Sequence, residues 1–150
     1  MVSQIRAAGL NQPIVGQEGY DSQKFIEIAG SASEGVMITT SLDRDSSSPE
    51  TQMFIKGFGK KAGYPADMVA ASGHTALLVL ADALKMSGST DAAALREAIA
   101  KTNLMASTGQ ISFNALGEVQ KDVQVQIVKD GNWRHHSTIS DPVLLSPPSE

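Results

Sequence analysis

The segment Pro13-Ile14-Val15-Gly16-Gln17-Glu18-Gly19-Tyr20-Asp21-Ser22 decides the fold. Its short apolar run, residues 13–16, is typical of a buried parallel strand. A polar loop follows, and either Asp21 or Ser22 can cap the helix with one apolar face that comes next. Gly30 ends that helix, and the β-branched run 36–40 predicts a second strand. A strand, a helix and a strand in this order indicate an α/β fold.

The middle of the sequence departs from this alternation. Ser48 followed by Pro49 is a strong helix start, because a capping hydroxyl precedes a residue with preset φ. The apolar run 68–86 then predicts a largely buried helix, and Thr90-Asp91 begins another helix soon after it. Two helices in succession indicate that the chain leaves one sheet for a second one.

A β-hairpin is expected near the C-terminus. Residues 110–114 predict a strand, and residues 123–127 alternate β-branched and glutamine side chains in the period-two pattern of a half-exposed strand. Asp130-Gly131 is a strong signal for a tight turn into the next strand. The tail 141–150 contains three prolines and is expected to be extended or disordered.

The first residues raise the question of what precedes them. Residues 3–9 predict the last turns of a helix that Gly9 ends, because glycine readily takes the positive φ of the C′ position. A helix this short does not offset its nucleation cost in water. Two explanations stay open: earlier turns precede Met1, or a short frayed helix packs on the sheet. No apolar segment follows a basic start here, so no signal peptide is expected in this chain.

Composition excludes several classes of function. The 150 residues carry 12 basic and 16 acidic side chains, a net charge of −4, and the densest basic pair is Lys60-Lys61. Nucleic-acid binding depends on clustered Lys and Arg, so no nucleic-acid partner is expected. The sequence has no cysteine, which excludes disulfides and thiolate metal sites. His74, Asp82 and Lys85 flank the longest apolar stretch, so no membrane span is expected.

No pattern predicts catalysis, a metal or a cofactor. Ser72 and His74 stand two residues apart on a predicted helix and point about 200° apart, so they cannot form a nucleophile–base pair. His135 and His136 are adjacent on a strand and face opposite ways, so they cannot chelate a metal together. The sequence contains no Gly-x-Ser-x-Gly elbow, dinucleotide fingerprint or phosphate-binding loop. We therefore expect a protein that is not an enzyme and has no catalytic residues.

Glu18 is the residue that suggests a binding function. It follows the strand 13–16, and open α/β sheets bind ligands outside the carboxyl ends of their strands. Gly16 and Gly19 flank it and would allow unusual backbone angles and the close approach of a ligand. A shielded carboxylate there would bind an ammonium group with about 1.5–3 kcal/mol. A solvated loop glutamate is the commoner role, so the spacing alone does not decide.

Several short motifs follow one another along the chain. They are, in order, Gln4–Leu10, Pro13–Gly19, Ala29–Val36, Ala71–Ala76, Gly88–Asp91, Thr108–Asn114 and Val128–Gly131. No single motif is specific, but their order and spacing together resemble the C-terminal half of the periplasmic branched-chain amino-acid-binding proteins, the type I solute-binding proteins of ABC importers. The resemblance extends from about residue 3 to residue 138.

The resemblance implies two α/β lobes that are joined by crossover segments and close on an amino acid. This chain would form part of that fold, an open, mostly parallel sheet flanked by helices, with a C-terminal β-hairpin. Residues 1–64 would belong to the C-terminal lobe, 65–118 to crossover helices and a strand of the N-terminal lobe, 119–140 to strands that return to the C-terminal lobe, and 141–150 to a tail. The break in alternation near Tyr64 fits the crossover.

The resemblance also implies a ligand site that needs no cofactor or metal. Glu18 matches the acidic residue that receives the ligand's α-ammonium group in amino-acid-binding members. Gly19 and Tyr20 adjoin it, and Tyr20 either lines the cleft or covers the loop. His74 is a further candidate ligand contact. The family commonly has Tyr-Asp-Ala where this chain has His74-Thr75-Ala76, and this difference favours a packed or surface histidine.

The implied function is that of a substrate-binding component of an ABC importer for branched-chain or related amino acids, present as a C-terminal fragment. Its partners would be the amino acid and the membrane permease, and the full-length protein would be periplasmic. A ligand-sensing domain of a receptor or regulator with the same fold is the alternative, and a flavodoxin-like enzyme domain is a remote third.

The fragment itself is expected to behave differently from a full-length member. In the family the first half supplies the hydroxyl and N–H groups that hold the ligand's carboxylate. We therefore expect this chain to bind free amino acids poorly or not at all, because one charged end would stay in water. Helices built to cover the first half would expose apolar faces, so self-association of the fragment is also expected.

Overall fold

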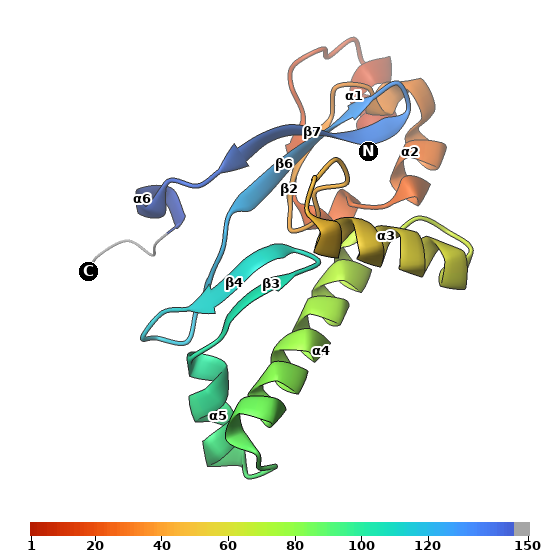
Figure 1. The fold of residues 1–150 in the computed structure, drawn as a ribbon. Helices are drawn as coiled ribbons and strands as arrows, with labels where there is room; N and C mark the ends of the chain where they lie inside the picture. The colour runs from red at the N-terminus through yellow and green to blue at the C-terminus, as the bar shows by residue number, and fades with distance from the viewer. Residues whose placement is uncertain (146–150) are drawn as a thin grey trace.

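The computed structural model describes residues 1–145 and contains two separate β-sheets, shown in Figure 1. The four-stranded sheet, called sheet A, has the strand order β1-β2-β6-β7, and the three-stranded sheet B has the order β3-β4-β5. The elements are α1 (Val2–Ala7), β1 (Val15–Gly16), the 3₁₀-helix η1 (Glu18–Tyr20), α2 (Gln23–Ala29), the 3₁₀-helix η2 (Gly30–Ser33), β2 (Met37–Thr40), α3 (Pro49–Ala62), α4 (Met68–Ser87), α5 (Ala92–Ala100), β3 (Asn103–Ala106), β4 (Gly109–Phe113), β5 (Val119–Gln120), β6 (Val123–Lys129), β7 (Asn132–Ile139) and α6 (Pro142–Leu145).

Sheet A combines two distant segments of the chain. β1 and β2 are parallel and are connected through α2, whereas β2 pairs with β6, and β6 with β7, in the antiparallel sense. The α/β class is therefore confirmed, but the sheet is mixed rather than mostly parallel, because β6 and β7 join it in the antiparallel sense. The predicted hairpin is also confirmed: Asp130 and Gly131 both have positive φ, 52° and 69°, as a type I′ turn requires.

The predicted caps hold the helix ends. The Ser22 hydroxyl accepts the Phe25 N–H at 3.2 Å, and the Asp91 carboxylate accepts two N–H groups of α5 at 3.0 Å each. Gly9 has a φ of 77° after α1, as expected of a C′ glycine. Val2 is buried in the core of sheet A, so tertiary packing supports this short helix.

One face of sheet A forms the first core with side chains of α1 and α2. Its buried residues are Val2, Ile26, Val36, Ile38, Val128 and Trp133. Gln126 is also fully buried and donates a hydrogen bond to Asp43 Oδ1 at 3.0 Å. The buried positions of β6 are thus Gln126 and Val128, while Val125 before them and Ile127 between them are only half-buried.

The chain leaves sheet A after α3 and returns to it at β6 (Figure 1). Residues 63–67 link α3 to α4, and a second core of Leu42, Phe54, Ala66 and Ala71 joins the two parts at this link. A third core packs α4 on sheet B through Val79, Ala106 and Ile111. β5 pairs with β4, so the return to sheet A falls between Gln120 and Val123.

α4 is less buried than its sequence predicts. Ala71, Thr75, Val79 and Ala83 are buried at four-residue spacing. On another face Val69, Leu77, Leu80 and Leu84 are exposed, Leu77 by 68%. The expectation of a largely buried helix was wrong, because no described element covers that second face.

The length and apolar composition of α4 contradict the expectation that no segment of this chain could span a membrane. By length and composition alone its 20 residues, with a mean hydropathy of 1.2, are long and apolar enough to cross a membrane. The flanking polar residues do not lower the mean hydropathy enough to prevent this. Core helices of water-soluble proteins have the same properties, and α4 packs on sheet B within an α/β fold.

The C-terminal segment is partly helical. Residues 142–145 form α6, where an extended or disordered tail was expected. Asp141 explains the difference, because its side chain accepts the Val143 N–H at 2.8 Å and its carbonyl oxygen accepts the Leu145 N–H at 3.1 Å. The rest of the expected tail, 146–150, lies outside the described residues.

Candidate functional site

The Glu18 loop lies at the carboxyl end of β1, as predicted. Residues 18–20 form η1, whose first side chain, Glu18, is exposed. Tyr20 is half-buried, packs on the core of sheet A and has its ring centroid 5.1 Å from that of Phe25. The Asp21 N–H donates to the Glu18 carbonyl oxygen at 2.9 Å and closes the turn. The turn therefore places Glu18 toward solvent and Tyr20 against the core.

The flanking glycines have a different role from the one expected. Neither Gly16 nor Gly19 has a positive φ, so neither provides an unusual backbone angle. A Cβ at Gly16 would clash with the ring of Tyr20, so this ring occupies the space that the glycine leaves. The interpretation that Gly16 admits a ligand was wrong. A Cβ at Gly19 would meet nothing within 4 Å, so the backbone of η1 is open there.

His74 lies at a different place from the Glu18 loop. Its ring stacks on Phe54 at a centroid distance of 4.8 Å, and its Nδ1 is 3.1 Å from the Ser107 hydroxyl oxygen. It lines a largely apolar cavity of about 590 Å³ between α3 and α4, whose lining residues include neither Glu18 nor Tyr20. The structure thus brings Glu18, Gly19 and Tyr20 together and places His74 in a separate, packed environment.

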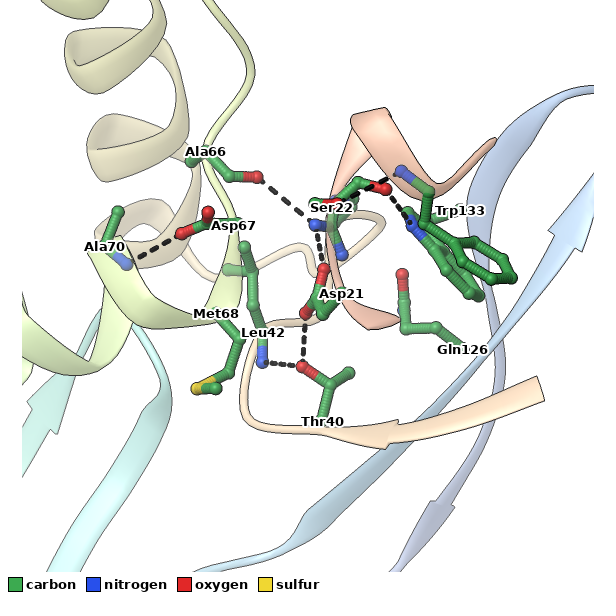
Figure 2. A network of polar contacts seen from close by, with 12 residues as sticks. Asp21, Ser22, Thr40, Leu42, Ala66, Asp67, Met68, Ala70, Gln126 and Trp133 are labelled. Carbon is green, nitrogen blue, oxygen red and sulfur yellow. Dashed lines mark hydrogen bonds and ion pairs between the residues drawn. The ribbon is translucent and has the colours of Figure 1, made fainter. Parts of the chain in front are cut away.

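A buried ion pair follows the Glu18 loop directly, and Figure 2 shows its surroundings. The Asp21 side chain is 0% exposed and pairs with the guanidinium group of Arg44. The other carboxylate oxygen of Asp21 accepts the Thr40 hydroxyl at 2.6 Å. Arg44 Nη2 also donates to the Ala66 carbonyl oxygen at 3.3 Å. The pair therefore connects the Glu18 loop, the end of β2 and the link between α3 and α4.

Sequence reasoning did not identify this ion pair. It treated Asp21 and Ser22 as alternative caps of one helix, and the structure assigns the cap to Ser22. Because only one residue occupies the N-cap position, the second acidic or hydroxyl residue is free for another partner. The presence of two adjacent capping residues indicated that one of them would have another partner. No nearby residue in the sequence identified Arg44 as that partner.

Lys121 brings a positive charge close to the Glu18 loop. It lies between β5 and β6, where the chain returns to sheet A, and its side chain is half-buried. Burial lowers the pKa of the Lys121 ammonium group below its usual 10.5, and the Glu18 carboxylate acts in the opposite direction. Lys121 therefore carries a partly buried positive charge on which the Glu18 carboxylate acts. No local pattern around Lys121 indicates this relation to Glu18.

Among the residues that the structure describes, no group of three His, Asp or Glu side chains is arranged to hold a metal ion. The candidate site consists instead of one exposed carboxylate, a short turn with an open backbone and a nearby ammonium group. Such a set of groups offers charge-assisted hydrogen bonds to a small polar ligand.

Known proteins share this architecture. A family model described as periplasmic binding protein matches residues 1–132. The leucine-, isoleucine-, valine-, threonine- and alanine-binding protein of Pseudomonas aeruginosa is 26% identical over 122 residues, which are 80% of this chain and 32% of that protein. A leucine-binding protein from Thermotoga maritima has a crystal structure that matches with a TM-score of 0.85 and 32% identity, over 95% of this chain and 41% of that one.

A third comparison supports the fold. The crystal structure of a leucine-, isoleucine-, valine-, threonine- and alanine-binding protein from Brucella ovis, in a closed conformation, matches with a TM-score of 0.85 and 19% identity. It is matched over 97% of this chain and 41% of its own length, so the chain spans less than half of each of these relatives. The match of the family model over residues 1–132, together with the shared fold, shows that this chain belongs to the periplasmic binding protein family.

Proposed function

We propose that this chain is part of the substrate-binding component of an ABC importer for branched-chain or related amino acids. The observation that carries the proposal is the exposed Glu18 carboxylate in a turn at the carboxyl end of β1, next to the buried Asp21–Arg44 pair. Relatives from Pseudomonas aeruginosa and Thermotoga maritima are, by name, binding proteins for such amino acids. The Glu18 carboxylate receives the ligand's ammonium group, and the open backbone at Gly19 leaves room for it.

The two sheets support a two-lobe arrangement. We assign residues 1–64 and 119–140 to one lobe and residues 65–118 to the crossover helices and strand of the other, with 141–150 as a tail. Closure of the lobes on the ligand shifts the population toward a form that the membrane permease recognises. The mechanism is binding without catalysis, and the full-length protein acts in the periplasm. His74, which lines a separate cavity, is left out of the proposed ligand site.

The role of Glu18 is tested by titrating the ¹⁵N-labelled chain with leucine and following the backbone amide signals of residues 18–21 by NMR. We expect weak, saturable binding with a millimolar Kd, because few groups of this chain reach the ligand's carboxylate. Glu18→Gln removes the charge that receives the ammonium group and should weaken this binding by about tenfold or more.

Glu27→Gln is the matched control. Glu27 is an exposed glutamate on α2 that pairs with Lys24, so its change should leave leucine binding as it is. Unchanged binding by Glu18→Gln would remove Glu18 from the site. Micromolar affinity of the unmodified chain for leucine or valine would contradict the expectation that the chain alone binds poorly.

The exposed face of α4 leads to a second prediction, that copies of this chain self-associate. Val69, Leu77, Leu80 and Leu84 form an apolar stripe that no described element covers. Light scattering should give a mass above that of one chain at high concentration, and the double variant Leu77→Glu, Leu80→Glu should lower it toward the monomer.

Ile28→Glu serves as the control for self-association, because Ile28 is an exposed apolar residue on α2, away from the stripe. This change should leave the measured mass unaltered. A strictly monomeric mass of the unmodified chain at high concentration would refute self-association.

A further inference from the structure

The cavity between α3 and α4 has a volume of about 590 Å³, within the range of about 300–1,000 Å³ that is usual for small-molecule sites. One face of α3 forms a wall of it, because the lining residues of this helix recur every three or four positions from Glu50 to Ala62. His74 and Leu78 of α4 complete the lining together with Ser107, which lies between β3 and β4. A molecule in this cavity would therefore contact both α3 and α4.

Gly57 leaves space in this cavity. It lies in the interior of α3, where glycine is unfavourable for a helix. A Cβ at this position would meet no atom of the described residues within 4 Å, so the packing of the fold does not require a glycine here. Because Gly57 lines the cavity, a larger side chain would take up part of its volume. Free space for a ligand gives this glycine a role that the fold itself does not give it.

The hydrogen bonds of Ser107 determine which nitrogen of His74 carries a proton. The Ser107 hydroxyl donates its one proton to the Ala71 carbonyl oxygen at 3.1 Å. Its oxygen must therefore accept from its other two neighbours, His74 Nδ1 at 3.1 Å and the Thr75 hydroxyl at 3.0 Å. In the uncharged ring the proton is thus on Nδ1, and Nε2 presents a lone pair that can accept a hydrogen bond.

Nε2 of His74 is available to a ligand. Among residues 1–145, the hydrogen bond of this ring is made by Nδ1, and Nε2 has no partner. Nε2 is not enclosed either, because the fully buried side-chain atoms without a partner in this part of the chain are Arg44 Nη1 and Gln126 Oε1. The ring stacks on Phe54 at a centroid distance of 4.8 Å, which fixes its orientation. The cavity therefore offers a positioned acceptor on a mostly apolar wall.

We propose that this cavity binds a small, uncharged aromatic compound with one hydrogen-bond donor, such as an indole or a phenol, and that the donor bonds to His74 Nε2. Phe54 and Phe58, whose ring centroids are 5.7 Å apart, provide aromatic contacts for its rings. Glu50 and Lys61 have opposite charges and are separated by about 16 Å along α3, so the lining favours neither a cation nor an anion. The site is separate from the Glu18 loop and does not depend on the proposed function.

Indole and 1-methylindole test the role of the donor, because a methyl group replaces the N–H hydrogen and the rings stay the same. Binding is followed by ¹³C NMR of the Met53 and Leu78 methyl groups, which belong to residues that line the cavity. Indole should bind saturably with a Kd of about 1 mM or below, and 1-methylindole about tenfold more weakly. Equal affinities would overturn the hydrogen bond to His74, and unchanged methyl signals in millimolar indole would overturn the site.

Two variants test the site from opposite sides. His74→Phe keeps a ring against Phe54 but removes the acceptor, so indole should bind to it no more tightly than 1-methylindole does. Gly57→Leu should fill the cavity and abolish binding of both compounds, while circular dichroism shows that the helices are retained. Lys56→Leu is the matched control, because it places the same side chain at an exposed position of α3 outside the lining and should leave binding unchanged. Unaltered indole binding by Gly57→Leu would refute the proposal.

The Glu18→Gln variant separates this inference from the proposed function. It should leave indole binding unchanged, because Glu18 does not line the cavity. Loss of indole binding in this variant would place the compound at the Glu18 loop and overturn the inference, while the proposed function would stand. A dilution series without ligand examines a second copy as the occupant. Met53 and Leu78 signals that change on dilution in the way that indole changes them would show that another copy fills the cavity, and the inference would be wrong.

Discussion

Replacing Asp21 with alanine is expected to lower the free energy of unfolding by about 3–5 kcal/mol, the usual cost of removing one partner of a buried ion pair. The change leaves the Arg44 guanidinium group, 18% exposed, without its counter-charge, and the Thr40 hydroxyl without its acceptor. Such a loss is a large share of the total stability of a small domain. Urea denaturation followed by circular dichroism measures the difference.

An exposed ion pair of the same chain provides the comparison. Lys24 and Glu27 pair on the surface of α2, so Lys24→Met should change the free energy of unfolding far less than Asp21→Ala does. The double variant Asp21→Ala, Arg44→Met should recover part of the loss, because it removes the unpaired buried charge. A loss for Asp21→Ala no larger than that for Lys24→Met would show that the buried pair does not stabilise the fold.

The same pair links stability to the candidate site. Asp21 follows η1 directly, and Arg44 also holds the carbonyl oxygen of Ala66 in the link between α3 and α4. Loss of the pair should therefore loosen the Glu18 loop as well as the link. Hydrogen exchange at the amides of residues 18–21 would report this loosening before global unfolding.

The features that could be predicted from the sequence are those with local causes. The caps at Ser22, Ser48 and Asp91 act within a few residues, and so does the turn at Asp130-Gly131. Their side-chain or backbone preferences determine where an element begins or ends, whatever the rest of the chain does. The strands of sheet A and strand β4 of sheet B were therefore predicted from the sequence, whereas β3 and β5 of sheet B were not.

The features that could not be predicted depend on partners far along the chain. Gln126 is buried because Asp43, 83 residues earlier, accepts its hydrogen bond, and no periodicity in β6 indicates this. The exposure of α4 depends equally on which elements are available to cover it. The alternation of apolar and polar residues gives the period of a helix or strand, but it does not show which face of that element becomes buried.

The candidate site shows the same division. Glu18 was found because strand ends and family motifs are visible in the sequence. Gly16 was misjudged because a glycine indicates that something approaches closely, but not that the approaching group is the ring of Tyr20. Lys121 was missed because its proximity to Glu18 exists only after the chain has returned to sheet A.

Trp133 is expected to be the most important apolar side chain of sheet A, and Trp133→Ala should lower the free energy of unfolding by about 3–5 kcal/mol. The side chain is 4% exposed, stacks on Phe25 at a centroid distance of 5.8 Å, and donates from Nε1 to the Ser22 carbonyl oxygen at 3.3 Å. Trp133 is the only tryptophan in the sequence, so circular dichroism rather than fluorescence must follow the unfolding.

Two further variants divide this loss between packing and hydrogen bonding. Trp133→Phe keeps an aromatic ring against Phe25 and removes only the donor to Ser22, so it should cost less than the alanine change. Tyr64→Ala removes an aromatic ring that is 59% exposed and should cost about 1 kcal/mol or less. If Trp133→Ala costs no more than Tyr64→Ala, the core between α2 and β7 does not hold the hairpin to the rest of sheet A. The position of β6, and with it that of the connection that precedes this strand, would then need another explanation.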